Sequence, residues 1–216
     1  MTKTVCVQGL GFVGFAMAIA VASAKNIDNQ EPLYKVIGVD LDNEVGRKKV
    51  KEINEGKFPI SCNDKKLEKA YFDVLEAKNF EATTNIDSFK TADFVIVDIN
   101  LDVDIKGEYS KINFQNFEKA IKTLGQNIKK DTLVIIETTI PPGTTEKLIY
   151  PSLLKEFKKR FAKDIKPKLA HSYERVMPGP EYIDSIREYP RVYSGINEES
   201  ANQVESFLET IIDTSI

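Results

Sequence analysis

Gly9-Leu10-Gly11-Phe12-Val13-Gly14, close to the N-terminus, is the stretch of sequence that decides the fold. Its spacing, G-x-G-x-x-G, also arises by chance, so the meaning depends on what flanks it. Residues 4–8 before it are rich in β-branched side chains, as a buried strand is. Residues 15–22 after it are small and apolar, which is typical of a helix packed closely on a sheet. The stretch therefore predicts a strand, a tight turn and the N-terminus of a helix.

The glycines of this turn suit the binding of a dinucleotide. Gly9 allows the turn, Gly11 lets the backbone approach a pyrophosphate, and Gly14 lets the helix pack against the strand. A helix N-terminus, here at Phe12 and Val13, presents N–H groups and the positive end of its dipole to a phosphate. We therefore expect the backbone of residues 9–14 to bind the cofactor.

Strand-like and helix-like segments alternate along the rest of the chain. Apolar stretches predict strands at residues 34–40, 80–84, 92–97, 132–136 and 168–171, and an edge strand at 191–195. Apolar periodicity predicts helices at residues 12–24, 44–54, 62–78, 114–128, 144–161 and 198–213. This alternation is typical of βαβ units. We expect a Rossmann-like α/β fold, a doubly wound and mostly parallel sheet with flanking helices.

Asp40 ends the second predicted strand. In the usual fingerprint an acid lies about 20 residues beyond the glycines, and the polar loop at residues 26–32 lengthens that spacing here. At that position Asp40 can accept hydrogen bonds from both hydroxyls of the adenosine ribose, and it would repel the 2′-phosphate of NADP. The alternative is that Asp40 caps the following helix, but Asp42 fits the cap better. The sequence therefore favours NAD.

The composition excludes several classes of function. A net charge of −3 gives no electrostatic case for binding nucleic acid or an anionic membrane. The apolar runs are shorter than a membrane-spanning helix, and the start of the chain has no signal-peptide pattern. Cys6 and Cys62 make no disulfide framework, and no Cys/His cluster suggests a metal. We expect a cytoplasmic protein without a metal centre.

Three further segments follow predicted strands and reach the edge of the sheet where ligands bind: residues 98–102, 137–145 and 172–179. The second and third of these segments, together with GLGFVG, resemble the nucleotide-sugar dehydrogenases, the UDP-glucose and GDP-mannose dehydrogenase group. Residues 138–144, TTIPPGT, are similar to the family's S-T-V-P-P-G-T. Residues 173–179, YERVMPG, are similar to P-E-R-V-x-P-G, a form typical of members that oxidise UDP-N-acetylhexosamines. The order and spacing of the motifs fit over the whole chain.

The resemblance implies a reaction. Members of the family oxidise the C6 primary alcohol of a nucleotide-linked sugar to a carboxylate with two NAD, holding the aldehyde as a thiohemiacetal on a cysteine. Thr139 matches the threonine near the nicotinamide that helps hold a water, and Glu174 matches the glutamate with general acid/base work. The alternative for Thr139 is a hydroxyl that bonds its own turn. The alternative for Glu174 is a surface ion pair with Arg175.

Departures from the family pattern concentrate after the fourth predicted strand. The family has V-P-T-P or V-N-T-P where this chain has Asp98-Ile99-Asn100-Leu101. Asn100 stands in place of the threonine, and we expect it to make that hydroxyl's hydrogen bonds to the cofactor. We expect Asp98 to add a negative charge near the cofactor. Tyr173 replaces the proline before the glutamate.

The family's cysteine motif, G-G-x-C, is the larger departure, because it and the long central helix before it do not occur in these residues. Cys6 is expected to be a core thiol and Cys62 a loop thiol, and the lone His171 is interpreted as structural. We therefore expect residues 1–216 to be one NAD-binding domain with a helical excursion at about 55–80, lacking the central helix and the UDP-sugar-binding domain.

We expect such a fragment to be inactive alone. The resemblance implies that the full-length enzyme is a homo-oligomer whose dimer contacts lie mostly in the central helix, so the fragment is expected to be monomeric. One alternative is a stand-alone NAD-binding module that regulates or docks a partner. Another is a 6-phosphogluconate-type or hydroxyacyl dehydrogenase, which needs a lysine or histidine motif that the sequence does not show.

Overall fold

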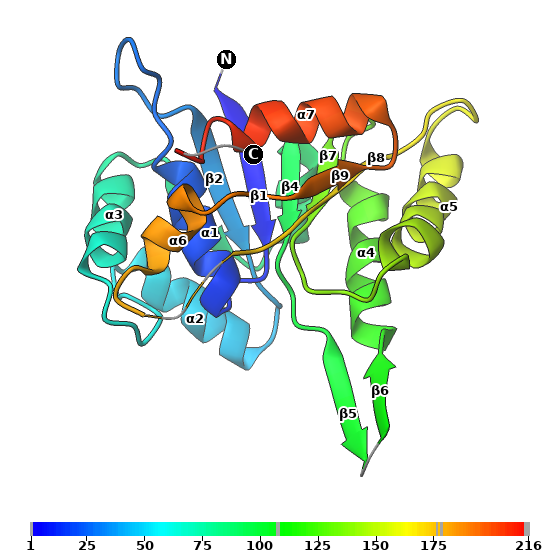
Figure 1. The fold of residues 1–216 in the computed structure, drawn as a ribbon, viewed down its shortest axis with the longest axis horizontal. Coiled ribbons are helices and arrows are strands. Elements are labelled where there is room, and N and C mark those ends of the chain that lie inside the picture. The colour runs from blue at the N-terminus through cyan, green and yellow to red at the C-terminus, as the bar shows by residue number, and fades with distance from the viewer. Residues whose placement is uncertain (1, 107–108, 176, 178, 214–216) are drawn as a thin grey trace.

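The computed structural model describes residues 2–106, 109–175, 177 and 179–213. Its main feature is a seven-stranded sheet with the order β3-β2-β1-β4-β7-β8-β9 (Figure 1). The strands are β1 (Lys3–Gln8), β2 (Tyr34–Val39), β3 (Phe80–Thr83), β4 (Phe94–Val97), β7 (Leu133–Ile136), β8 (Lys168–Ser172) and β9 (Tyr193–Gly195). Every pairing is parallel except that of β9 with β8. The predicted doubly wound α/β fold is confirmed, with its switch of strand order between β1 and β4.

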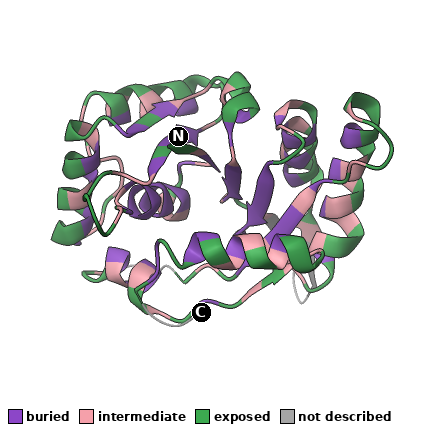
Figure 2. Cartoon of the chain, turned by 90° about the horizontal axis from the view of Figure 1, so that it is seen from above, coloured by how far each residue is buried: buried purple, intermediate pink, exposed green. Residues whose placement is uncertain are grey.

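Helices cover both faces of this sheet. They are α1 (Phe12–Ala22), α2 (Glu44–Asn54), α3 (Lys65–Glu76), the 3₁₀ helix η1 (Ile86–Thr91), α4 (Gln115–Asn127), the π-helical turn η2 (Thr145–Ile149), α5 (Tyr150–Arg160), α6 (Tyr182–Glu188) and α7 (Glu198–Leu208). The helices α1, α3, α6 and α7 share one hydrophobic core, and η1, α4 and α5 share the other. Figure 2 shows the buried strands lying between helices whose outer faces are exposed.

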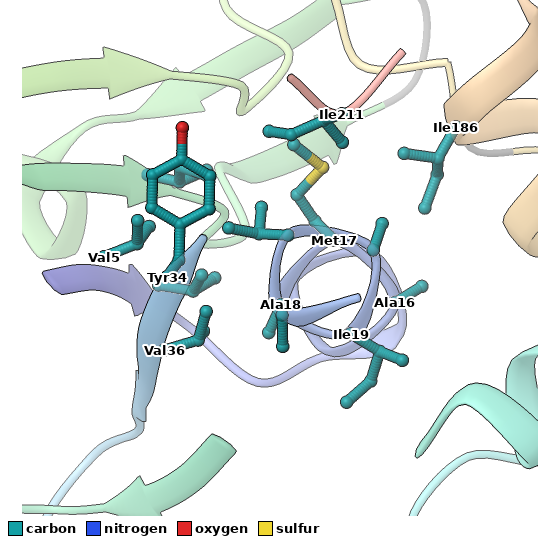
Figure 3. Packing of buried hydrophobic residues seen from close by; sticks show 14 of the residues in the cluster. Val5, Ala16, Met17, Ala18, Ile19, Tyr34, Val36, Ile186 and Ile211 are labelled. Atoms are coloured by element: carbon teal, nitrogen blue, oxygen red, sulfur yellow. The ribbon is translucent and has the colours of Figure 1, made fainter. Parts of the chain in front are cut away.

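Helix α1 is buried along most of its length against the sheet. Residues 14–22 are all buried, and a helix that is apolar all round belongs in a protein interior. Its small alanines let it approach the sheet, while Met17 and Ile19 fill the space toward neighbouring elements, as Figure 3 shows. Strand β2 contributes Tyr34 to the same cluster. This packing fixes the helix so that its N-terminus lies at the carboxyl end of β1.

Several predicted boundaries were wrong by a few residues. Helix α1 ends at Ala22 instead of residue 24, and the Ser23 hydroxyl donates to the carbonyl of Ile19 as the chain leaves the helix. The N-cap of α2 is Asn43, which accepts from the Gly46 N–H at 2.8 Å, so the expectation of Asp42 was wrong. The last helix, expected to reach residue 213, ends at Leu208.

The strands β5 (Asp102–Lys106) and β6 (Tyr109–Asn113), the helix α6 and the 3₁₀ helix η1 were not predicted from the sequence. Strands β5 and β6 form an antiparallel hairpin that extends away from the body of the molecule (Figure 1). The short α6 follows the segment after β8 and packs on α1 and α3. The D-V-D-I-K alternation of β5 is a strand signal that the prediction from sequence did not use, whereas α6 has only seven residues, too few for a clear helical periodicity. No helix in the described ranges is both long and apolar enough to cross a membrane.

Candidate active site

The glycine turn is shaped by two close backbone approaches. Gly9 has φ of +97°, and a Cβ atom there would lie 2.3 Å from the carbonyl oxygen of Asp98. A Cβ atom on Gly14 would lie 2.0 Å from the carbonyl oxygen of Gly9. A side chain at either position would collide with backbone, which has little room to yield. The turn therefore closes tightly between the ends of β1 and β4.

Gly11 differs from these two glycines because it faces open space. A Cβ atom on Gly11 would meet nothing within 4 Å. Gly11 is also the N-cap of α1, and among the described residues no side chain caps the start of that helix. The first N–H groups of α1, at Phe12 and Val13, lack an intrahelical partner by position. This combination of open space, uncapped N–H groups and a helix dipole fits a pyrophosphate, as NAD requires.

Asp40 lies where the sequence places it, directly after β2 at the same edge of the sheet. Its N–H donates to the carbonyl of Thr83 at 3.0 Å, and its Oδ1 accepts from the N–H of Leu41 at 2.7 Å. Its Oδ2 forms an ion pair with the Nζ of Lys49 at 2.6 Å, which the sequence did not reveal. The side chain is 11% exposed. Asp40 is thus held rigidly beside the glycine turn, with a cation next to it.

The predicted residues beyond the turn meet around one cavity of about 500 Å³. Val13 contributes from the helix N-terminus, Asn100 follows β4, Thr139 follows β7 and Glu174 follows β8. The fold therefore brings all four together from distant parts of the sequence. Val176 and Pro178, which belong to the YERVMPG segment, lie outside the described residues.

The hydroxyl that ties the loops of the cavity together belongs to Thr138. This side chain is buried, and its Oγ1 lies 2.9 Å from the carbonyl of Ile99 and 3.1 Å from the N–H of the same residue. The adjacent Thr139 is exposed at the cavity. The structural work of this turn thus falls to Thr138, which leaves Thr139 positioned to face a ligand.

A buried charge cluster lies beside the cavity and was not foreseen. Arg191, just before β9, places its Nη1 at 3.5 Å from Oε1 of Glu137, with side chains 0% and 1% exposed. The same Nη1 donates to the carbonyl of Tyr173 at 2.7 Å. Asp98 and Glu174 line the cavity with Glu137. Nothing local in the sequence signals this cluster, because Glu137 and Arg191 come together only through the order of the strands.

The electrostatics of the cluster change the interpretation of Asp98. Burial, together with the charges of Glu137 and Glu174, raises the pKa of the Asp98 carboxyl well above its usual range, against the opposing effect of Arg191. Burial also raises the pKa of Glu137, although Arg191 lowers it. In the unliganded chain these surroundings disfavour the ionised form of Asp98. That Asp98 places a negative charge near the bound cofactor stays a prediction.

The remaining reactive side chains lie elsewhere. His171 lines a second cavity, of about 410 Å³, and burial lowers the pKa of its imidazole. Cys6 lies in β1, and burial, followed by the charge of Asp93, raises the pKa of its thiol to about 12. Cys62 is half-buried. Neither cysteine is among the described residues that line the two cavities.

Comparison with known proteins agrees with this geometry. The chain is 31% identical over 214 residues to a UDP-N-acetyl-D-mannosamine dehydrogenase of Methanocaldococcus jannaschii, covering 99% of this chain and 44% of that protein. It is 29% identical over 208 residues to a Pyrococcus horikoshii protein of the same name, covering 96% of this chain and 44% of the relative. The chain thus spans less than half the length of these relatives.

A solved structure shows the same fold. The NDP-N-acetyl-D-galactosaminuronic acid dehydrogenase of Methanosarcina mazei superposes with a TM-score of 0.86 at 28% identity, covering 99% of this chain and 43% of that one. The model of the NAD binding domain of the UDP-glucose/GDP-mannose dehydrogenase family matches residues 3–212. This match agrees with the open space at Gly11 and the uncapped start of α1, and it supports NAD as the cofactor. The chain therefore belongs to the UDP-glucose/GDP-mannose dehydrogenase family.

Proposed function

We propose that residues 1–216 are the NAD-binding domain of an enzyme that oxidises the C6 primary alcohol of a UDP-linked N-acetylhexosamine to a carboxylate. The observation that carries this proposal is the single cavity at which the N-terminus of α1 meets Thr139 and Glu174. The names of the two archaeal relatives and the YERVMPG segment support the choice of an N-acetylhexosamine. The sugar itself is part of the proposal.

Each part of the site has a role in this proposal. The backbone of residues 9–14 binds the pyrophosphate, because Gly11 leaves space and the helix N-terminus offers N–H groups. Asp40 accepts hydrogen bonds from the adenosine ribose. Asn100 offers an amide to the cofactor where relatives offer a hydroxyl. When bound, NAD supplies the acceptor for a hydride from the sugar carbon.

The proton of the sugar hydroxyl must leave as the hydride leaves. Thr139 is exposed at the cavity and holds a water there, while Glu174 accepts the proton directly or through that water. A carboxylate within hydrogen-bond reach of a bound water suits this work. No thiol of the described residues lines the cavity. The later steps, which depend on a cysteine in the family, would thus need residues beyond these 216.

The experiment is to express the longest reading frame that contains these residues and to measure NADH formation with UDP-N-acetylhexosamines. We expect turnover, with Glu174→Gln and Thr139→Val lowering kcat while the calorimetric Kd for NAD stays within a factor of about 3. His171→Gln, which alters a side chain of the other cavity, is the matched control. Unchanged kcat in Glu174→Gln would contradict the assigned role. A reading frame that binds NAD but contains no further domain would favour the stand-alone module.

A further inference from the structure

Three carboxyl groups and one guanidinium make up the charge cluster beside the cavity, in which Glu137 and Arg191 are buried and Asp98 and Glu174 are half-buried. Asp98 follows β4, Glu137 follows β7 and Glu174 follows β8, and all three line the cavity. Arg191 does not line the cavity and pairs with Glu137. If every carboxyl were ionised, the cluster would carry more negative charge than one arginine can balance. Such an excess is costly in a site shielded from water.

Two carboxyl oxygens of the cluster are shielded from solvent without a hydrogen-bond partner among the described residues: Oδ2 of Asp98 and Oε2 of Glu137. Glu137 is only 2% exposed. Buried polar atoms are normally satisfied, so an unpartnered pair of oxygens that line a cavity points to a ligand or a proton at that place. The arginine already directs its Nη1 to the carbonyl of Tyr173.

Among the described residues, the charges that act on Asp98 are those of Glu137, Glu174 and Arg191. The glycine turn approaches it with backbone only, at Gly9 and Gly14. From α6, Tyr182 donates its hydroxyl hydrogen to the carbonyl of Phe12 at 2.6 Å. Burial raises the pKa of Tyr182, so this phenol stays neutral. The balance of charge is therefore set within the four-residue cluster.

We propose that Asp98, Glu137, Glu174 and Arg191 share one proton, held chiefly by Asp98, and that this proton leaves when oxidised NAD binds. The inference rests on the proposed function, because it places the nicotinamide half of NAD in the cavity. In a doubly wound sheet the dinucleotide lies across the switch of strand order, and Asp98 ends β4 at that switch. The oxidised nicotinamide ring carries a positive charge, whereas the reduced ring is neutral.

The positive ring changes the balance of the cluster. A cation next to a protonated carboxyl favours its ionised form, so the O–H bond of Asp98 breaks and the proton passes to solvent. The resulting carboxylate stabilises the bound ring. Release of a proton on binding means that affinity for oxidised NAD rises with pH until the unliganded Asp98 ionises by itself. Reduced NAD lacks the charge, so its affinity should change little with pH.

The test is calorimetric titration of this chain with oxidised and with reduced NAD, in two buffers of different ionisation enthalpy. The difference between buffers gives the number of protons released. We expect up to about one proton with oxidised NAD, a much smaller number with reduced NAD, and affinity for oxidised NAD that rises up to about tenfold per pH unit. Asp98→Asn should abolish both the release and the pH dependence. Asp93→Asn, at the opposite end of β4, is the matched control and should retain both.

The outcomes separate this inference from the proposed function. Equal proton release with oxidised and reduced NAD, or unchanged release in Asp98→Asn, would overturn the shared proton while leaving NAD binding intact. If neither oxidised nor reduced NAD binds, the proposed function is overturned and this inference with it. The comparison of oxidised with reduced NAD uses the unaltered chain, so it decides the matter even where a variant fails to fold.

Discussion

Arg191 and Glu137 form a fully buried ion pair, with Nη1 and Oε1 3.5 Å apart and side chains 0% and 1% exposed. Glu137 follows β7 and Arg191 precedes β9, and Arg191 also donates to the carbonyl of Tyr173, the residue before Glu174. Removing one partner of a buried pair leaves the other charge uncompensated. This pair therefore anchors the segment that carries Glu174 as well as the sheet.

The first prediction concerns that anchor. Arg191→Met should lower the free energy of unfolding by about 3–5 kcal/mol, as measured by chemical denaturation. Lys69→Met is the control, because its ion pair with Asp73 is largely exposed, and such pairs contribute about 0–1 kcal/mol. An Arg191→Met variant as stable as the Lys69→Met variant would show that the buried pair has no anchoring role.

The second prediction separates the structural role of Gly14 from the cofactor-binding role of Gly11. Gly14→Ala should destabilise the chain, by about 1–3 kcal/mol for an overpacked contact, because its Cβ atom would collide with the carbonyl of Gly9. Gly11→Ala should leave the unfolding temperature unchanged and weaken NAD binding, since its Cβ atom enters only the space for the pyrophosphate. Thermal unfolding with and without NAD measures both effects. Equal loss of stability in the two variants would contradict this division.

The third prediction concerns the cofactor. Asp40→Ala should remove hydrogen bonds to the ribose and weaken NAD about 10- to 150-fold, as loss of a charged hydrogen bond of about 1.5–3 kcal/mol does. NAD should then no longer protect the chain from thermal unfolding, and NADP should protect the unaltered chain much less than NAD. Equal protection by NADP would count against the role of Asp40.

Lys49 supplies a matched variant for the same test. Its ammonium lies 2.6 Å from Oδ2 of Asp40 and offsets the negative charge that discriminates against a 2′-phosphate. Lys49→Met should therefore raise the ratio of NADP Kd to NAD Kd, by calorimetry. A lower ratio would mean that Lys49 does not offset Asp40.

The parts of the site that the sequence predicted are those in which neighbouring residues decide the structure. The glycine turn, Asp40 and the TTIPPGT segment follow strands whose apolar runs are plain in the sequence. The parallel topology then brings Thr139 and Glu174 to the same edge. Local residue spacing, together with the rule that ligands bind at the carboxyl ends of parallel strands, was enough to predict these parts of the site.

The remaining parts depend on long-range packing or on choices that residue preference leaves open. Glu137 and Arg191 are 54 residues apart, and the sequence around each of them contains no signal that the two side chains pair. Asp42 and Asn43 are equally good N-caps by type, and the extended backbone of Asn43 decides between them. Asp98 looks like a charged loop residue in the sequence, but only the assembled cluster shows that its acid form is favoured.

The fourth prediction is a dependence of stability on pH. A carboxyl whose pKa is raised in the folded chain binds its proton more tightly there than when unfolded, so its stabilisation is complete below the ordinary Asp pKa. That stabilisation is lost as pH rises through the folded value. Asp98→Asn should thus gain stability relative to the unaltered chain as pH increases from about 4 to 8, by up to about 1.4 kcal/mol per pH unit.

Asp93 should give a pH dependence of stability of the opposite sign, so it serves as the control. Burial alone would raise the pKa of its carboxyl, but hydrogen bonds from Lys129 and the Thr4 N–H outweigh it, so the pKa is lowered. The stability that Asp93 contributes is present above the ordinary Asp pKa and is lost as pH falls. Denaturation curves that also extend below the ordinary Asp pKa measure both variants. A parallel pH dependence in Asp98→Asn and the unaltered chain would refute the raised pKa.

The last prediction is that the 216-residue chain binds NAD but completes no sugar oxidation. Formation of the carboxylate in this family depends on a cysteine, and no thiol of the described residues lines either cavity. Cys6 is buried in β1 with its pKa raised to about 12, which makes it a poor nucleophile. Calorimetry with NAD should come first, because it shows that the chain is folded and competent to bind. Incubation with UDP-N-acetylhexosamines should then give no NADH and no uronate, whereas turnover by this chain would mean that the site is complete without a second domain.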